Sequence, residues 1–163
     1  MNAWIIINLV LLLVITNGAP VLASLLLKQR FNQPLDYNLQ FIDGRPLLGA
    51  AKTVRGIISA ILLTTLMAPL FGLSPAQGSL FALLAMSGDL VSSFIKRRLG
   101  ITSSRSSPLL DQLPETLLPL WVMHPFLNET IPEACAAILV FVVIDWFASM
   151  QREPVNNDAS DAG

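Results

Sequence analysis

The chain has 163 residues, of which 53% are hydrophobic and 13% are charged, and its mean hydropathy is +0.63. A soluble protein of this length needs far more charge on its surface, so the composition excludes an ordinary soluble domain and predicts a polytopic membrane protein. A single cysteine, Cys135, and a single histidine, His124, exclude an internal disulfide and clustered imidazole ligands. We expect one all-α domain, 1–150, and a disordered polar tail, 151–163.

Five apolar segments have the length of a membrane-spanning helix, about 17–25 residues. They are Ala3–Leu27, Val54–Phe71, Gly78–Ile95, Leu109–Leu127 and Glu133–Met150. The fourth is the weakest, because Pro114 and Pro119 interrupt it and polar residues lie at its start. Helix-breaking residues are tolerated at membrane depth where they face protein or a water-filled cavity, so we expect this segment to face one of the two.

The basic residues predict the orientation of these helices. With five crossings, lysine and arginine fall on one side only, in the segments that follow the first, third and fifth helices. The residues are Lys28, Arg30, Arg45, Lys52, Arg55, Lys96, Arg97, Arg98, Arg105 and Arg152. The positive-inside rule therefore predicts an N-terminus outside, a C-terminus in the cytoplasm and a location in the cytoplasmic membrane.

The first helix contains the stretch "TNGAPVLA", in which Asn17, Gly18 and Pro20 predict a bend. The bend exposes the polar side chain of Asn17 at some depth in the membrane. Proline also bends membrane helices for packing alone, so Asn17 and Pro20 are minor candidates for a binding site.

The segment between the first two helices is long and rich in turn-forming residues, which is typical of a functional loop. It ends in "LLGAAKT", whose spacing does not match a P-loop. Gly49 frees backbone amides, while Lys52, Thr53 and Arg55 supply donors at the start of the second helix, where a phosphate is favoured. From this loop alone two interpretations remain open: phosphate binding, or cations that only set the topology.

The third helix ends in "GDLVSSFIKRRLG", which places Asp89 about two turns before Lys96, inside the headgroup boundary. A carboxylate at that depth normally has a partner or a function. Ser92 and Ser93 share its helix face. Asp111 opens the fourth helix from the same side, so the two acids could hold a divalent cation that bridges phosphates. The alternative is an ion pair between Asp89 and a lysine or arginine.

Two other polar residues are expected to lie outside this chemistry. Asp145, near Trp146, is expected to be a structural hydrogen-bonding residue. His124 lies at the outer end of the fourth helix, far from every cation, and is expected to be an interfacial residue.

Four motifs together resemble the CDP-archaeol synthase family of membrane cytidylyltransferases. They are "NGAPVLA", "PLDYNLQFIDGRPLLGAAKTVRG", "GDLVSSFIKRRLG" and "PLLDQLPE", and they occur in the family's order over about residues 16–115. The resemblance implies five transmembrane helices and transfer of a cytidylyl group from CTP to a lipid phosphate, with Mg²⁺ and release of pyrophosphate. The chain departs from the family's pattern at Asn38, where a glycine is usual, and at Val54, where an aromatic residue is usual.

The resemblance also implies roles for residues of this chain. Asp89 and Asp111 correspond to the metal-binding acids and are, with Lys96, the expected catalytic residues. Lys52, Arg55, Lys96, Arg97 and Arg98 correspond to the triphosphate and lipid-phosphate ligands. Thr53, Ser92 and Ser93 are expected phosphate ligands because of their positions beside these residues. The loop expected to close over the nucleotide contains Asp43, Gly44, Arg45 and Gly49. Asn17 and Pro20 correspond to the family's bent first helix.

The leading hypothesis is therefore a cytidylyltransferase whose partners are CTP, a lipid phosphate and the membrane lipids, with no nucleic acid. A small transporter or channel for an anion, and a membrane protein whose charges only fix its topology, are the alternatives. A transporter should have polar residues on both sides of the membrane midplane, and here the outer halves of the helices are almost wholly apolar. Five helices also cannot divide into equal inverted repeats. The sequence does not indicate the oligomeric state.

Overall fold

The computed structural model describes residues 1–101 and 108–150, with side chains omitted at 108, 109, 149 and 150. Within this part of the chain the structure is helical, with two isolated β-bridges and no β-strand. Arg105 and the tail predicted for 151–163 lie outside the described residues.

All five predicted helices are present, each within a few residues of its expected bounds. They are α1 (Ala3–Leu27), α2 (Val54–Met67), α3 (Pro75–Arg98), α4 (Pro108–Leu127) and α5 (Ile131–Met150). A 3₁₀ turn, η1 (Ala68–Phe71), extends α2 to the predicted end of the second segment. Four of these segments have the length and hydropathy of a membrane span: α1, α2 with η1, α3 and α5.

Local sequence signals explain where the helices begin. Asn2 and Thr53 cap α1 and α2 by accepting hydrogen bonds from the amides of Trp4 and Gly56. Ser74 and Gln77 form a reciprocal capping box at the start of α3. These caps satisfy amides that have no partner inside a helix, so the starts of α1, α2 and α3 are each specified by a few neighbouring residues.

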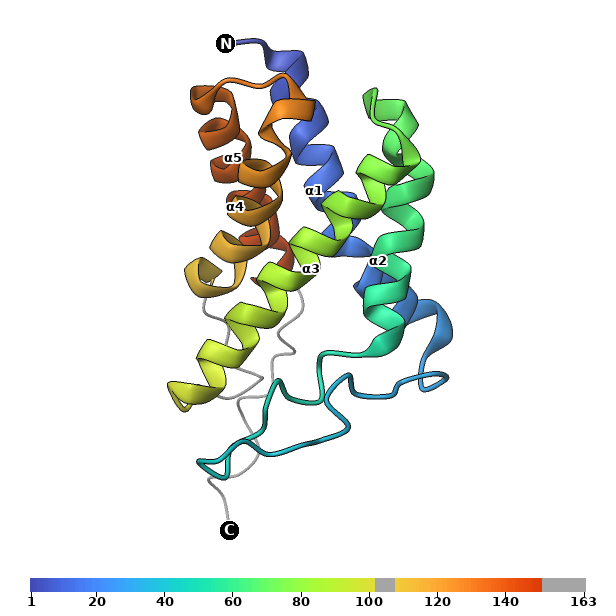
Figure 1. Ribbon diagram of the computed structural model, residues 1–163, viewed down its shortest axis with the longest axis vertical. Helices are drawn as coiled ribbons and strands as arrows, with labels where there is room; N and C mark the ends of the chain where they lie inside the picture. Colours follow the sequence, from blue (N-terminus) through green and yellow to red (C-terminus); the bar gives the residue numbers. More distant parts are fainter. Residues whose placement is uncertain (102–107, 151–163) are drawn as a thin grey trace, which may run out of the picture.

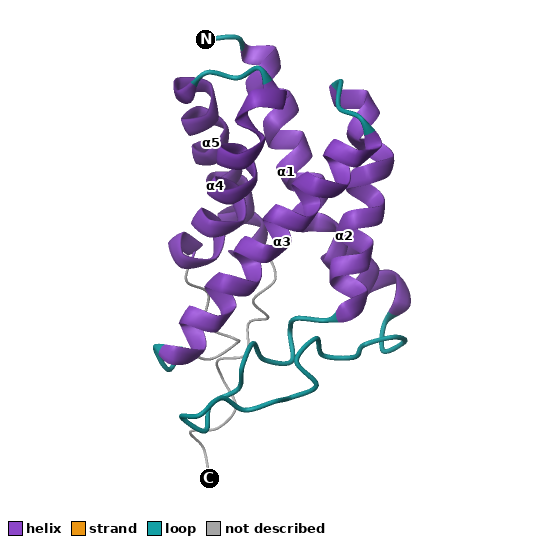
Figure 2. Cartoon of the chain, viewed as in Figure 1, coloured by secondary structure: helices purple, strands orange, loops and turns teal. Residues whose placement is uncertain are grey.

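The five helices form a closed ring, in which each helix packs mainly against two others (Figure 1). Helix α1 contacts α2 and α5, α3 contacts α2 and α4, and α4 contacts α5. The long loop, residues 28–53, crosses one end of the bundle, and the N-terminus lies at the opposite end (Figure 2). At that opposite end Glu133 accepts hydrogen bonds from the amides of Asn2 and Thr130, and His124 contacts Glu129. His124 is therefore remote from the loop, as expected.

The larger apolar core and most of the buried basic residues lie in different halves of the bundle. The main apolar core fills the half near the N-terminus and includes Leu9, Leu12, Leu13, Phe81, Leu120, Met123, Ala137 and Phe141. The half near the loop buries polar and charged side chains instead, among them Ser92, Ser93, Lys96, Arg97, Gln112 and Glu115. Buried charges are stable only with partners, so the loop end is where a functional site is expected.

Helices α3 and α4 approach closely at Gly88. A Cβ atom built on Gly88 would lie 2.2 Å from the carbonyl oxygen of Pro114, far inside van der Waals contact. Because the obstacle is backbone, it cannot be relieved by a side-chain rotation. Glycine at this position therefore allows α3 to bring Asp89 next to α4.

We predict that Gly88→Ala destabilises the protein by about 1–3 kcal/mol or more, because the added methyl group must push α3 and α4 apart. Gly18→Ala in α1 is the matched control: no atom lies within 4 Å of its built Cβ. Since alanine is the better helix former, the control should be neutral or slightly stabilising. Thermal unfolding in detergent measures both variants, and equal melting temperatures would contradict the close-packing argument.

Candidate active site

A cavity of about 490 Å³ lies at the loop end of the bundle, and all five helices contribute to its wall. Seven predicted site residues line it: Asn17, Pro20, Lys52, Thr53, Arg55, Asp89 and Asp111. Further polar residues on the wall are Ser24, Asn32, Glu115 and Asp145. The remainder is mainly apolar and includes Val21, Ile57, Met86 and Leu90. The cavity therefore offers charged groups and an apolar surface in one space.

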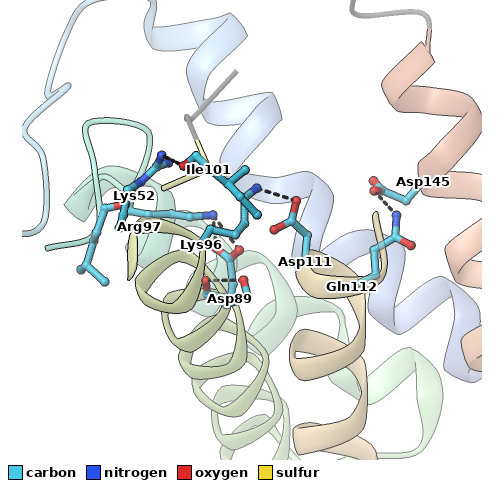
Figure 3. A network of polar contacts seen from close by, with 10 residues as sticks. Lys52, Asp89, Lys96, Arg97, Ile101, Asp111, Gln112 and Asp145 are labelled. Carbon is cyan, nitrogen blue, oxygen red and sulfur yellow. Dashed lines mark hydrogen bonds and ion pairs between the residues drawn. The ribbon is translucent and has the colours of Figure 1, made fainter. Parts of the chain in front are cut away.

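Two lysine–aspartate pairs join the elements around the cavity (Figure 3). The Lys52 ammonium, from the loop before α2, lies 2.6 and 2.7 Å from the two carboxylate oxygens of Asp89 on α3. The Lys96 ammonium, on α3, lies 2.8 Å from one carboxylate oxygen of Asp111 on α4. Asp89 thus forms the ion pair that the sequence analysis gave as the alternative to metal binding, and the partner of Asp89 is Lys52. Asp89 and Asp111 line the same cavity, and their role in metal binding stays a prediction.

Asp36 fixes the loop that presents Lys52. Its side chain is buried and accepts hydrogen bonds from the amides of Asn38, Leu48 and Gly49, at 2.8 to 3.0 Å. Burial alone would raise the pKa of Asp36, but these three amides outweigh it and lower the pKa below its ordinary value. The carboxylate is therefore charged at neutral pH, and it holds the two arms of the loop together.

Backbone contacts complete the presentation of Lys52. The Leu35 amide donates to the Lys52 carbonyl at 2.7 Å, and the Lys52 amide donates to the Gly49 carbonyl at 3.1 Å. Gly49 has a φ of +96°, a conformation that favours glycine, and its built Cβ would lie 3.0 Å from the Arg97 guanidinium. Gly49 thus permits a turn that brings the loop against α3. Its predicted role in nucleotide binding stays a prediction.

Three arginines of the predicted site donate hydrogen bonds to backbone carbonyls. Arg45 donates to the carbonyls of Arg97 and Arg98, which closes the C-terminus of α3. Arg97 itself donates to the carbonyls of Leu48 and Ile101. Arg55 donates to the carbonyls of Lys28 and Arg30 beyond the end of α1. In this structure these guanidinium groups attach the loop to the helix ends.

Arg98 holds the tip of the loop. Its guanidinium lies 4.7 Å from the ring centre of Phe41 and 5.1 Å from that of Phe94, and it pairs with Asp43. Slight burial opposes ionisation of Asp43, but the Arg45 amide and the Arg98 guanidinium together lower its pKa below the ordinary value. Gly44, with a φ of +73°, forms the turn beside Asp43. The tip of the loop is therefore held against α3 by an ion pair and by cation–π contacts.

Several predicted residues lie outside the wall of the cavity. They are Asp43, Gly44, Arg45, Gly49, Ser92, Ser93, Lys96, Arg97 and Arg98. Lys96 reaches the cavity through its pair with Asp111. Ser92 and Ser93 are buried, and the Ser92 hydroxyl donates to the Asp89 carbonyl within α3.

Glu115 and Asp145 were not assigned to the site from the sequence. Glu115 is 8% exposed and lies one helical turn after Asp111 on the same face of α4, a spacing that could have identified it. Asp145 accepts a hydrogen bond from Gln112 at 2.7 Å, which agrees with a structural role, but it also lines the cavity. No short-range pattern in the sequence pairs Gln112 with Asp145, because they lie on different helices.

The donor atoms of the cavity suit a hard cation such as Mg²⁺. Mg²⁺ takes oxygen ligands and is usually bound by one or two carboxylates together with substrate phosphates and water. Among the described residues no group of three or more His, Cys, Asp or Glu side chains could hold an ion. Both side-chain polar atoms of Asn17, on the cavity wall, are buried without a hydrogen-bond partner. The two carboxylates, Asp89 and Asp111, are thus oxygen ligands of the kind that a metal ion would use only together with a bound phosphate.

Comparison with known proteins identifies the family. The family model described as CarS-like, CDP-archaeol synthase, matches residues 5–153. The CDP-archaeol synthase of Hyperthermus butylicus is 38% identical over 122 residues, which cover 67% of this chain and 70% of that protein. The CDP-archaeol synthase of Aeropyrum pernix is 35% identical over 136 residues, covering 77% of this chain and 75% of that protein.

A solved structure agrees with these matches. It is described as an intramembrane enzyme for archaeal membrane lipid biosynthesis and superposes with a TM-score of 0.73. The two sequences are 33% identical, and the match covers 88% of this chain and 92% of the other. The resemblance drawn from the four sequence motifs is confirmed, and the chain belongs to the CDP-archaeol synthase family.

Proposed function

We propose that this protein is an intramembrane cytidylyltransferase that joins CTP to a lipid phosphate and releases pyrophosphate. Family membership supports this reaction over transport of an anion. The observation on the molecule that best supports it is one cavity whose wall combines Lys52 and Arg55 with carboxylates and apolar side chains. Such a cavity suits a reaction between a polar nucleotide and a membrane lipid.

The proposed reaction is an in-line displacement at the α-phosphorus of CTP. An oxygen of the lipid phosphate forms the new P–O bond, the bond between the α-phosphorus and the bridging oxygen breaks, and pyrophosphate leaves with the electron pair. Phosphoryl-type transfer needs positioning and charge neutralisation rather than covalent help from the protein. Lys52, and Lys96 beside Asp111, would neutralise phosphate oxygens, while Val21, Ile57 and Met86 would contact the lipid.

Asp89 and Asp111 are the residues we propose as metal ligands. When bound, Mg²⁺ supplies Lewis-acid stabilisation of the charge on the transferring phosphate. The relatives' name, CDP-archaeol synthase, makes a glycerol phosphate lipid with ether-linked isoprenoid chains the first substrate to test.

We predict that Asp89→Asn lowers pyrophosphate release from CTP by about a hundredfold or more, because metal-ion stabilisation of the transition state is worth several kcal/mol. The assay contains purified protein in detergent, CTP, Mg²⁺ and a panel of lipid phosphates, and it should also fail when the divalent cation is removed. Glu129→Gln, which removes the same charge at the opposite end of the bundle, is the control and should stay active. Near-normal turnover of a folded Asp89→Asn protein would reject this metal assignment.

We also propose that all five helices cross the membrane, with the loop and the cavity on the cytoplasmic side. Helix α4 has 20 residues and packs along α3, which supports a fifth crossing. The lysines and arginines of the described residues belong to the loop, the start of α2 and the end of α3, which supports a cytoplasmic loop. CTP, a cytosolic nucleotide, would then reach the cavity directly.

Sided cysteine labelling tests this orientation. In a background with Cys135→Ser, we expect Ala76→Cys to react with a membrane-impermeant maleimide on intact cells. Gln40→Cys, in the exposed part of the loop, should react only after the cells are permeabilised. Labelling of permeabilised cells is the control, because both cysteines should then react. The opposite pattern would place the loop outside.

A further inference from the structure

We propose that Lys52 and Lys96 are counter-ions that hold the coordinating oxygens of Asp89 and Asp111 until a complex of metal and nucleotide displaces them. The inference concerns the site of the proposed function and rests on its metal assignment. It predicts that a divalent cation binds weakly by itself and tightly together with CTP.

The geometry of the Lys52–Asp89 pair supports this competition. The ammonium contacts both carboxylate oxygens, at 2.6 and 2.7 Å, so both are occupied by one cation. Both side chains are largely shielded from solvent, with 26% of Lys52 and 19% of Asp89 exposed. A divalent cation placed on the same oxygens would lie against the ammonium in a poorly screened environment. Metal binding therefore requires Lys52 to leave Asp89.

The second pair, between Lys96 on α3 and Asp111 on α4, is also shielded from solvent. Lys96 contacts one oxygen of Asp111 at 2.8 Å, and only 9% of its side chain is exposed. A cation that approaches Asp111 meets an ammonium that cannot move fully into solvent. Removing one member of such a buried pair leaves a charge without a partner, which is unfavourable.

A nucleotide removes this penalty. Phosphate oxygens that arrive with the metal give each displaced ammonium a new anionic partner at about the same place. The ion pairs are exchanged rather than lost, so metal and nucleotide should each increase the affinity for the other by the same factor.

Lysine is suited to this exchange in a way that the neighbouring arginines are not. Hydrogen bonds to Leu35 and Gly49 fix the backbone of Lys52, while its side chain has four rotatable methylene groups that can redirect a compact charge. Arg97 and Arg45 each hold two backbone carbonyls. Moving them would release the loop from α3. The two lysines can therefore change partners while the arginine contacts between the loop and α3 stay in place.

The test is Mn²⁺ binding to the full-length protein in detergent, measured by electron paramagnetic resonance without nucleotide. We expect Lys52→Met to bind Mn²⁺ at least about tenfold more tightly than the unmodified protein, the size expected when an adjacent like charge is removed from a part-buried site. Lys52→Arg keeps the positive charge and should bind as weakly as the unmodified protein. Lys28→Met removes an exposed lysine at the end of α1 and should change nothing.

Lys96→Met is an independent second variant, because it frees Asp111 and should also strengthen Mn²⁺ binding. It decides the question if Lys52→Met fails to fold. Unchanged or weaker Mn²⁺ binding in the folded lysine-to-methionine variants overturns the inference. The proposed function would survive that result if Asp89→Asn still abolished pyrophosphate release, so the two failures are distinguishable.

Discussion

A charged carboxylate buried in a membrane protein is costly without a partner, and the site of this protein depends on how Asp89 is paired. Its partner, Lys52, comes from a loop rather than from a neighbouring helix. The ion pair therefore joins the long loop to α3 and fixes one edge of the cavity. Without it a buried charge would remain unpaired, at a cost of several kcal/mol.

The arginines and the lysines at this end of the bundle make different kinds of contact. Arginines such as Arg45 and Arg97 donate to carbonyl oxygens at the helix ends, where a planar group with five donors can satisfy two acceptors at once. Lysines such as Lys52 and Lys96 face carboxylates at the cavity. The arginines thus stabilise the loop, and the lysines remain able to change partners.

The helices could be predicted because apolar runs of the right length leave few alternatives in a membrane. The placement of Asp89 and Asp111 at the same end of the bundle could be predicted because the order of the helices brings both to the side of the loop. The path of the loop could not, since it depends on Asp36 accepting three amide hydrogen bonds, a contact that no spacing encodes. The partners of the arginines follow from that path. The contribution of Asp145 depends on how α5 packs against α4.

The most direct test of the central claim is an experimental structure with Mg²⁺ and CTP bound. The account predicts a metal ion in contact with Asp89 and Asp111, and the Lys52 ammonium moved from Asp89 to a phosphate oxygen. It also predicts that Arg45 and Arg97 keep their carbonyl partners. A nucleotide bound elsewhere, with Lys52 still paired to Asp89, would contradict the account.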